Sequence, residues 1–259
     1  MSAPVWMHPV VLGIFGAMIG SFLNVVIYRV PRGMSIVNPP SSCTSCSARI
    51  KPWDNVPVLS WILLGGKCRT CQTRISPRYP LIEGATALVF AGCGRFLPDP
   101  SLVIPALLFS GAMIAVTFID LDHRIIPDAI TYPGLAIALI LSFTGISIDP
   151  SHAFWGALAG GGSLFLVAWC YRVVTGRDGL GGGDIKLLAM VGAFLGPVGA
   201  ALTILFGSLA GTLFAIATMK SSGLGLKSEL PFGTFLAPCA VLVLFVGARL
   251  FSWYWNLFL

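Results

Sequence analysis

The stretch Gly179-Leu180-Gly181-Gly182-Gly183-Asp184-Ile185-Lys186 places one carboxylate where an apolar segment begins. An ionisable side chain at such a position is costly without a partner or a function, so Asp184 is a candidate functional residue. Glycines admit backbone geometries closed to other residues and let a second chain pass close by. A phosphate-binding loop is excluded, because the run lacks the Gly-Lys-Ser/Thr ending and follows no expected strand.

The composition indicates an integral membrane protein. Of the 259 residues, 56% are hydrophobic and only 10% are charged, against roughly 25% charged in a soluble domain. We expect an all-α polytopic membrane protein with about eight transmembrane helices, of which the second is the weakest prediction and the sixth is short. The eight expected spans are 10–28, 81–97, 101–119, 130–148, 154–174, 185–198, 200–219 and 234–257.

Two C-x-x-C pairs, separated by 21 residues, lie in the loop between the first two spans. Four thiolates at this spacing satisfy a closed tetrahedral zinc site, and we expect structural zinc on Cys43, Cys46, Cys68 and Cys71. Two disulfides are the competing interpretation, which a reducing compartment disfavours. The expected domains are therefore a first transmembrane helix (1–29), a zinc-binding loop domain (30–80) and a membrane helix bundle (81–259).

The basic residues are distributed unevenly over the two membrane faces. With alternating spans, Arg95 and Arg249 fall on one face and fourteen Lys and Arg residues fall on the other. This positive-inside bias predicts that the cysteine loop and both acid clusters face the cytoplasm, and it explains the net charge of +6 without nucleic acid. The fourteen are Arg29, Arg32, Arg49, Lys51, Lys67, Arg69, Arg74, Arg78, Arg124, Arg172, Arg177, Lys186, Lys220 and Lys227.

The first span carries small residues at close spacing, Gly13, Gly16 and Gly20, followed by Asn24. Small residues let a neighbouring helix approach, and an amide can hydrogen-bond across the interface, so helix packing is the expected role. Glu83 lies near the start of the second span. Its carboxylate either interacts favourably with the helix dipole or points into a polar cavity, and the sequence leaves both open.

A second cluster of acids occurs in the turn from residue 118 to residue 128. Asp120 and Asp122 are two residues apart, so on a continuing helix they point roughly 200° apart and cannot share one site. Asp128 is expected to act as an N-cap of the fourth span, and His123 remains open as a ligand or general base. One acid of this turn and Asp184 together would provide the two carboxylates of an aspartyl protease.

The ordered set of motifs resembles the type IV prepilin leader peptidases, bacterial membrane aspartyl proteases with a Gly-x-Gly-Asp motif. The resemblance covers nearly the whole chain. One departure is Thr234, where relatives often have proline. The motifs that carry the resemblance are Gly20-Ser21-Phe22-Leu23-Asn24, the cysteine pairs around Asp54-Asn55 and Leu59-Ser60-Trp61, Arg78-Tyr79-Pro80-Leu81, the Asp120 turn, Gly181-Gly182-Gly183-Asp184 and Pro231-Phe232-Gly233.

The resemblance implies an enzyme that removes the short basic leader of prepilins or pseudopilins after a glycine, at the cytoplasmic face of the bacterial inner membrane. It implies Asp120 and Asp184 as the catalytic pair and selects Asp120 over Asp122. It also implies methylation of the new amino terminus with S-adenosylmethionine, for which the sequence shows no binding motif. Two close carboxylates cannot both ionise easily, so such a pair shares a proton.

The alternative function is a membrane transporter that relays protons or binds a cation through its acids. A transporter would carry its acids near the bilayer midplane and show an internal repeat. In this sequence the acids lie at the expected ends of spans, and no convincing repeat is found. A scaffold that only assembles partners around a zinc loop would leave the acids in the spans unexplained.

Overall fold

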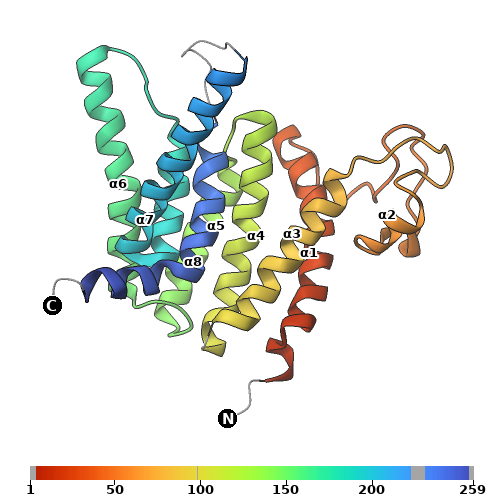
Figure 1. Ribbon diagram of the computed structural model, residues 1–259, viewed down its shortest axis with the longest axis horizontal. Coiled ribbons are helices and arrows are strands. Elements are labelled where there is room, and N and C mark those ends of the chain that lie inside the picture. The colour runs from red at the N-terminus through yellow and green to blue at the C-terminus, as the bar shows by residue number, and fades with distance from the viewer. Residues whose placement is uncertain (1–3, 98, 223–230, 257–259) are drawn as a thin grey trace. The chain divides into compact units, whose positions relative to one another are not determined.

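The computed structural model describes residues 4–97, 99–222 and 231–256, and within them every regular element is a helix (Figure 1). The chain forms two compact units, Met1–Ala115 and Val116–Leu259, which are described separately. The helix α4 (Pro100–His123) begins in the first unit and ends in the second. An all-helical architecture confirms the expected fold class.

In the first unit, α1 (Pro9–Arg29) and α3 (Arg78–Phe96) pack closely through glycine. A Cβ added at Gly16 would lie 2.8 Å from the carbonyl oxygen of Thr86, and one added at Gly20 would lie 2.6 Å from the Cα of Glu83. The Asn24 side chain donates to the Tyr79 carbonyl at 3.2 Å. The expected helix packing is therefore confirmed, with the backbones themselves in contact.

The chain between α1 and α3 forms a small lobe without strands. The helix α1 ends at Arg29, is followed by η2 (Val30–Arg32), and stops at Gly33, which has φ +65°. The Arg29 guanidinium donates to the Ser35 carbonyl at 2.9 Å, so the turn folds back over the helix end. The lobe contains η3 (Pro52–Asn55) and the five-residue helix α2 (Leu59–Leu63).

An apolar cluster closes the opposite end of the first unit. Met7, in η1 (Val5–Met7), is buried with Leu12, Phe90 and Val103, which come from α1, α3 and α4. The short N-terminal turn therefore packs under the three helices.

The second unit contains α5 (Asp128–Phe143), α6 (Pro150–Thr175), α7 (Gly182–Ser222) and α8 (Gly233–Trp255). The helices α6 and α7 touch backbone to backbone: the place of a Cβ on Gly156 is occupied by the carbonyl of Gly192, and that on Gly160 by the carbonyl of Leu188. Gly160 and its neighbour Gly161, where a Cβ would lie 2.9 Å from the Cβ of Ala189, thus serve packing.

The helix α7 is a hairpin of two helices that turns at Gly196. This residue has φ +74° and ψ 178°, outside the helical region, and Pro197 follows it. A Cβ on Gly160 would meet both the Leu188 carbonyl and, at 3.3 Å, the Cβ of Ala200. Residues 188 and 200 would lie about 18 Å apart on a straight helix, so the chain reverses between them. The halves correspond to the sixth and seventh expected spans.

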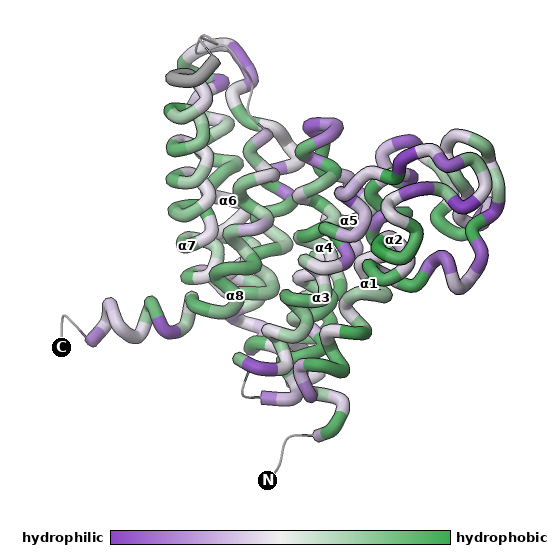
Figure 2. The backbone as a smooth tube through the Cα atoms, turned by 45° about the vertical axis from the view of Figure 1, so that its right-hand side comes forward, coloured by the Kyte–Doolittle hydropathy of each residue, from purple (hydrophilic) through white to green (hydrophobic). Residues whose placement is uncertain are grey.

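The eight expected spans correspond to α1, α3, α4, α5, α6, the two halves of α7, and α8. Five helices of the described residues, with α7 counted once, are long and apolar enough to cross a membrane, while α5 is shorter. Figure 2 shows the hydrophobic residues along these helices and hydrophilic residues at their ends and in the lobe. The expected fourth span, 130–148, was too long, because α5 ends at Phe143 and Gly145 has φ +70°.

The close backbone contact at Gly156 predicts that a larger residue there destabilises the packing of α6 on α7. Gly156→Ala would place a Cβ against the backbone of Gly192 and should cost about 1–3 kcal/mol of stability, since overpacking a close contact displaces backbone. Gly162→Ala is the matched control, because nothing lies within 4 Å of a Cβ there. Thermal unfolding of both purified variants in detergent measures the difference. Equal melting temperatures would contradict the packing described.

Candidate active site

Asp120 lies in the last turn of α4, with its side chain turned into the second unit. The residue is buried, at 4% exposure, whereas Asp122 is exposed. Arg124, at φ +54°, donates its backbone N–H to the Asp120 carbonyl at 2.8 Å and so ends the helix. The expectation that Asp120 and Asp122 point in different directions is confirmed.

The start of α8 holds the Asp120 carboxylate. The backbone N–H of Thr234 donates to Asp120 Oδ2 at 2.6 Å, and the Thr234 hydroxyl lies 3.0 Å from the same oxygen. The first N–H groups of a helix have no partner inside the helix, and the helix dipole favours a negative charge beside them. A Cβ on Gly233 would lie 3.0 Å from Asp120 Oδ2, so glycine permits this close approach.

Asp184 enters the same site from the start of α7. It is the third residue of the helix, and its backbone N–H donates to the Gly181 carbonyl at 3.1 Å. Its Oδ1 is buried and has no hydrogen-bond partner among the described residues.

The side chain of Ile126 packs between Gly183, which precedes Asp184, and Gly233, which precedes Thr234. A Cβ on Gly183 would lie 3.0 Å from Ile126 Cβ, and one on Gly233 would lie 2.7 Å from Ile126 Cδ1. Three helix ends therefore converge here: the end of α4 and the starts of α7 and α8.

Asp128 and Lys186 form an ion pair beside the two acids. Lys186 Nζ lies 2.7 Å from Asp128 Oδ1, and it also lies 5.0 Å from the centre of the Tyr132 ring. The prediction that Asp128 caps α5 was wrong: Pro127 is the N-cap, and Asp128 is the first residue of the helix. The pair joins residues 58 apart in sequence, so no local signal could have indicated it.

Glu83, which the sequence left open, lies in the first unit. It is 8% exposed, and its Oε2 accepts the backbone N–H of Val58 at 2.7 Å. The carboxylate therefore ties the lobe to α3. His123 is the last residue of α4, half-buried.

The four lobe cysteines form one cluster that could hold a metal ion. Their Sγ atoms all lie within 4.8 Å of one another, and those of Cys43 and Cys71 are 3.7 Å apart. Tetrahedral zinc with Zn–S of about 2.3 Å needs sulfurs about 3.8 Å apart. All four are free thiols.

The two C-x-x-C pairs have the same backbone design. Cys43 donates its N–H to the Ala48 carbonyl and Cys68 to the Thr73 carbonyl, both at 2.9 Å. In each, the residue after the second cysteine has positive φ: Ser47 at +57° and Gln72 at +59°. Two matching turns thus present two thiols each toward one point, as a closed metal site requires.

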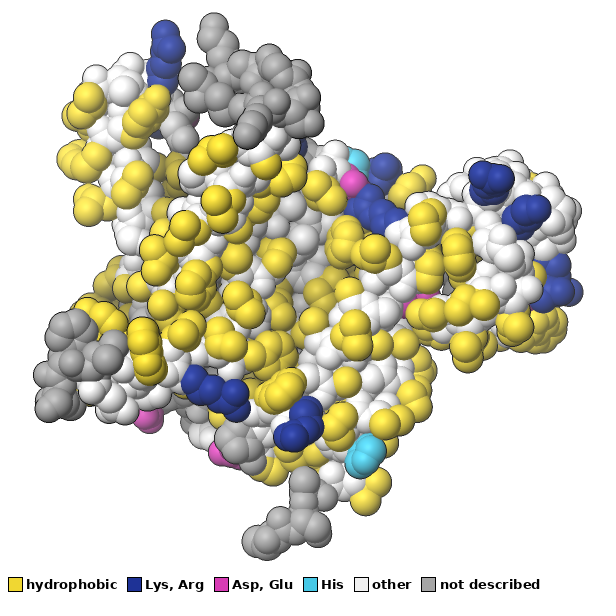
Figure 3. All heavy atoms as spheres, viewed as in Figure 1, with side chains coloured by type: hydrophobic (Ala, Val, Ile, Leu, Met, Phe, Trp, Pro, Cys, Tyr) yellow, Lys and Arg dark blue, Asp and Glu magenta, His cyan; other side chains and the backbone are white. Residues whose placement is uncertain are grey.

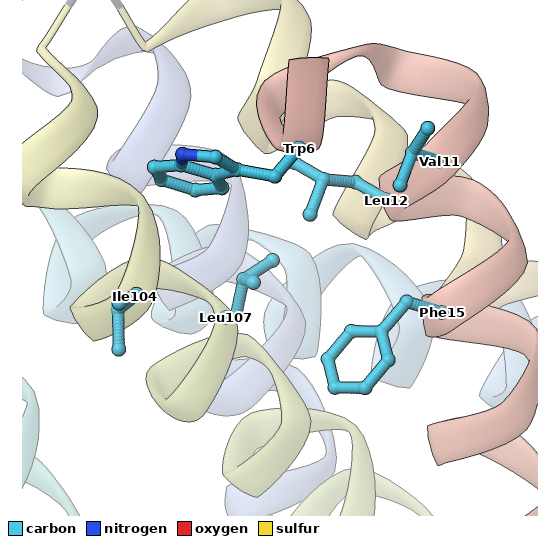
Figure 4. A pocket seen from close by; sticks show the side chains of 6 residues that line it. All are labelled: Trp6, Val11, Leu12, Phe15, Ile104 and Leu107. Atoms are coloured by element: carbon cyan, nitrogen blue, oxygen red, sulfur yellow. The ribbon is translucent and has the colours of Figure 1, made fainter. Parts of the chain in front are cut away.

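A separate groove of about 350 Å³ lies on the first unit (Figure 4). None of its six lining side chains is titratable, so it offers no group for acid–base chemistry. They are Trp6, Val11, Leu12, Phe15, Ile104 and Leu107.

The chain is similar to known peptidases along most of its length. Residues 14–95 match the family model of the bacterial peptidase A24 N-terminal domain, and residues 107–216 match that of the type IV leader peptidase family. The chain is 34% identical to a prepilin leader peptidase/N-methyltransferase of Pseudomonas aeruginosa, over 92% of this chain and 90% of that protein. It is 36% identical to the protein of the same name from Neisseria gonorrhoeae, over 81% and 82% of the two chains. No solved structure matches the chain. The chain therefore belongs to the type IV leader peptidase family.

Proposed function

We propose that this chain is an aspartyl endopeptidase that removes the short basic leader of type IV prepilins or pseudopilins, cleaving after a glycine at the cytoplasmic membrane face. The observation that carries the proposal is that Asp120 and Asp184 come together where three helices end, around the side chain of Ile126. Substrate and cleavage position follow from the family and from the names of the relatives.

The hydrogen bonds suggest how the two acids divide the reaction. Because the Thr234 N–H donates to Asp120 Oδ2, that oxygen acts as an acceptor, and the proton of the pair resides on Asp120 Oδ1 or on Asp184. The ionised member takes a proton from a water, which attacks the scissile carbonyl, while the protonated member donates to the carbonyl oxygen. No metal takes part in this step.

The charge distribution supports an orientation with the site and the lobe in the cytoplasm of a bacterial inner membrane. Fourteen basic residues fall on the proposed cytoplasmic face and two on the other. A prepilin would then enter as a membrane helix, and its leader would lie beside the end of α4 and the start of α7. Asp122 lies exposed at the end of α4 and would attract the basic leader.

The transporter alternative is weaker, because the acids lie at helix ends. Asp120 is three residues from the end of α4, and Asp184 is the third residue of α7. Relayed protons or bound cations would call for acids near the midplane. The family match does not favour it either.

The names of the relatives pair the peptidase with an N-methyltransferase, and methylation of the new amino terminus with S-adenosylmethionine is part of our proposal. It rests on the relatives alone. Within the described residues there is no Rossmann-type unit, in which a strand leads through a glycine-rich loop into a helix that binds a nucleotide cofactor. No step of peptide cleavage passes through this cofactor.

The cysteine cluster is proposed to hold one structural zinc ion. The distances fit four thiolates, and no position is left for a water, so the metal would stabilise the lobe and not perform chemistry. Metal binding would then contribute to the folding of residues 30–80 as a domain. This domain would lie in sequence between the first transmembrane helix, 1–29, and the helix bundle, 81–259.

Metal analysis tests the zinc proposal. The purified protein should contain about one zinc per chain, lost in Cys43→Ser and in Cys68→Ser because three thiolates bind zinc less tightly. Cys170→Ser, an exposed single cysteine on α6, is the control that should keep its zinc. A folded, active preparation free of zinc would contradict the proposal.

Substitution of the acids tests the peptidase mechanism. Asp120→Asn and Asp184→Asn should each lower prepilin cleavage by about 100-fold or more, since an amide cannot exchange the proton. The double variant should be little worse than either single one, because the acids act as a unit. Asp122→Asn, which changes an exposed acid of the same turn, should retain substantial activity. Full cleavage by Asp184→Asn would defeat the proposal.

Thr234 is expected to position Asp120 and not to bind the substrate. Thr234→Val keeps the shape and the backbone N–H but removes the hydroxyl, and it should lower kcat by about tenfold, the value of one hydrogen bond to a charged group. KM should stay unchanged, which a general structural defect would not produce. Thr234→Ser restores the hydroxyl and should restore kcat. A valine variant with wild-type kcat would show that the hydroxyl has no role.

A further inference from the structure

The short helix α2 turns its apolar side outward. Leu59, Ile62 and Leu63 follow the spacing of one helix face and are 60%, 60% and 85% exposed. Trp61 faces the lobe instead, where its Nε1 donates to the Ile75 carbonyl at 3.1 Å. A helix of a soluble domain would have the opposite arrangement, so this outward stripe needs an apolar environment.

The stripe lies beside the membrane helices and not beyond their ends. The N–H of Val58, which precedes α2, donates to Glu83, and Glu83 lies five residues into α3, about 7.5 Å along its axis. Glu83 also packs on Gly20, nine residues before the end of α1. Figures 1 and 2 both show α2 alongside α1. The start of α2 therefore lies level with the first turns of α3, where that helix would enter a bilayer.

The start of α2 is fixed by a strained residue. Val58 has φ +62° and ψ −51°, a conformation that is rare for a β-branched side chain. The hydrogen bond to the buried Glu83 holds it there. Strain of this kind persists only where its surroundings determine it, so the orientation of α2 is set by the fold.

The lobe around the stripe is basic. Residues 30–80 contain one acid, Asp54, whose carboxylate is bound to Arg69 at 2.6 Å. This guanidinium holds the pKa of Asp54 below its ordinary value, so the pair stays ionised and mutually neutralised. Figure 3 shows basic side chains over the lobe and apolar ones along its edge. The basic residues of this range are Arg32, Arg49, Lys51, Lys67, Arg69, Arg74 and Arg78.

Apolar and basic groups meet at Trp53. This residue is 63% exposed, and Lys51 Nζ lies 5.5 Å from the centre of its ring. Tryptophan favours the membrane interface, where its ring is among acyl chains and its N–H is near the headgroups. Lys67 and Arg74, both exposed, lie opposite each other in an antiparallel bridge. Exposed apolar side chains flanked by basic groups are the features of in-plane membrane anchors.

We propose that Trp53 and the stripe of α2 lie in the membrane interface and that Lys51, Lys67 and Arg74 bind anionic phospholipid headgroups. The lobe would thereby be a second, in-plane membrane contact, beside the spanning helices. A lipid is favoured over a protein partner because the charge and the depth both match a headgroup region.

Lipid quenching of tryptophan tests the anchor in the full-length protein. The protein is placed in nanodiscs of phosphatidylcholine, with or without phosphatidylglycerol, whose acyl chains carry bromine near the interface. The Trp53 signal is the difference between wild type and Trp53→Phe, since the chain has seven tryptophans. Bromine should quench this signal, about twofold more strongly when phosphatidylglycerol is present.

Two sets of substitutions separate the contribution of the apolar stripe from that of the basic residues. Replacing Leu59, Ile62 and Leu63 by serine should abolish the quenching, whereas Val37→Ser, at an equally exposed position of the lobe, should leave it unchanged. Replacing Lys51, Lys67 and Arg74 by glutamine should remove only the dependence on phosphatidylglycerol. Unchanged melting temperatures in detergent show that the variants fold.

Three results would overturn the proposal. A Trp53 signal that is quenched by iodide in the buffer and not by brominated lipid would place the stripe in water. Equal quenching in both bilayers would exclude a role for the basic residues. Cross-linking through Lys51 into dimers, with no lipid quenching, would show that a second copy of the chain covers the stripe.

Discussion

The close approach of α6 to both halves of α7 determines how the second unit is built. Gly156 and Gly192 meet through their backbones, and Gly160 contacts one half of the hairpin at Leu188 and the other at Ala200. In lipid, helices gain little from apolar surface alone, so contacts of this kind supply much of the packing. Because the contact fixes the first half of α7, it also fixes the height at which Asp184 enters the site.

The two acids have different surroundings. Asp120 is buried, and it receives the N–H of Thr234 at the start of α8, where a helix offers unpaired donors and a favourable dipole. One oxygen of Asp184 is buried and has no hydrogen-bond partner within the part of the chain that the structure describes. A proline at position 234 would have neither an N–H nor a hydroxyl. The hold on Asp120 in this chain is therefore a property of its threonine.

The sequence predicted what depends on local pattern and composition. Hydrophobic runs located the helices, the glycine run marked the start of Asp184's helix, and the C-x-x-C spacing predicted one thiol cluster. The family resemblance, and not periodicity, selected Asp120. Contacts between distant residues gave no signal: Lys186 with Asp128, or Glu83 with Val58. The end of α5 was misplaced, because Gly145 ends an apolar run that continues in sequence.

The turn at Gly196 has a consequence for the bilayer itself. The first half of α7, residues 182–195, is 14 residues long, and α5 has 16. Their lengths of about 21 and 24 Å are well below the roughly 30 Å of a hydrocarbon core. These helices pack together, since the place of a Cβ on Gly134 is filled by the side chain of Met190. The first half of α7 is largely buried, whereas α5 has an exposed side that would meet the lipid, and a thinner bilayer accommodates such a short helix. Headgroups and their water would then lie closer to the start of α5, which the Asp128–Lys186 ion pair joins to the start of α7 and thus to Asp184.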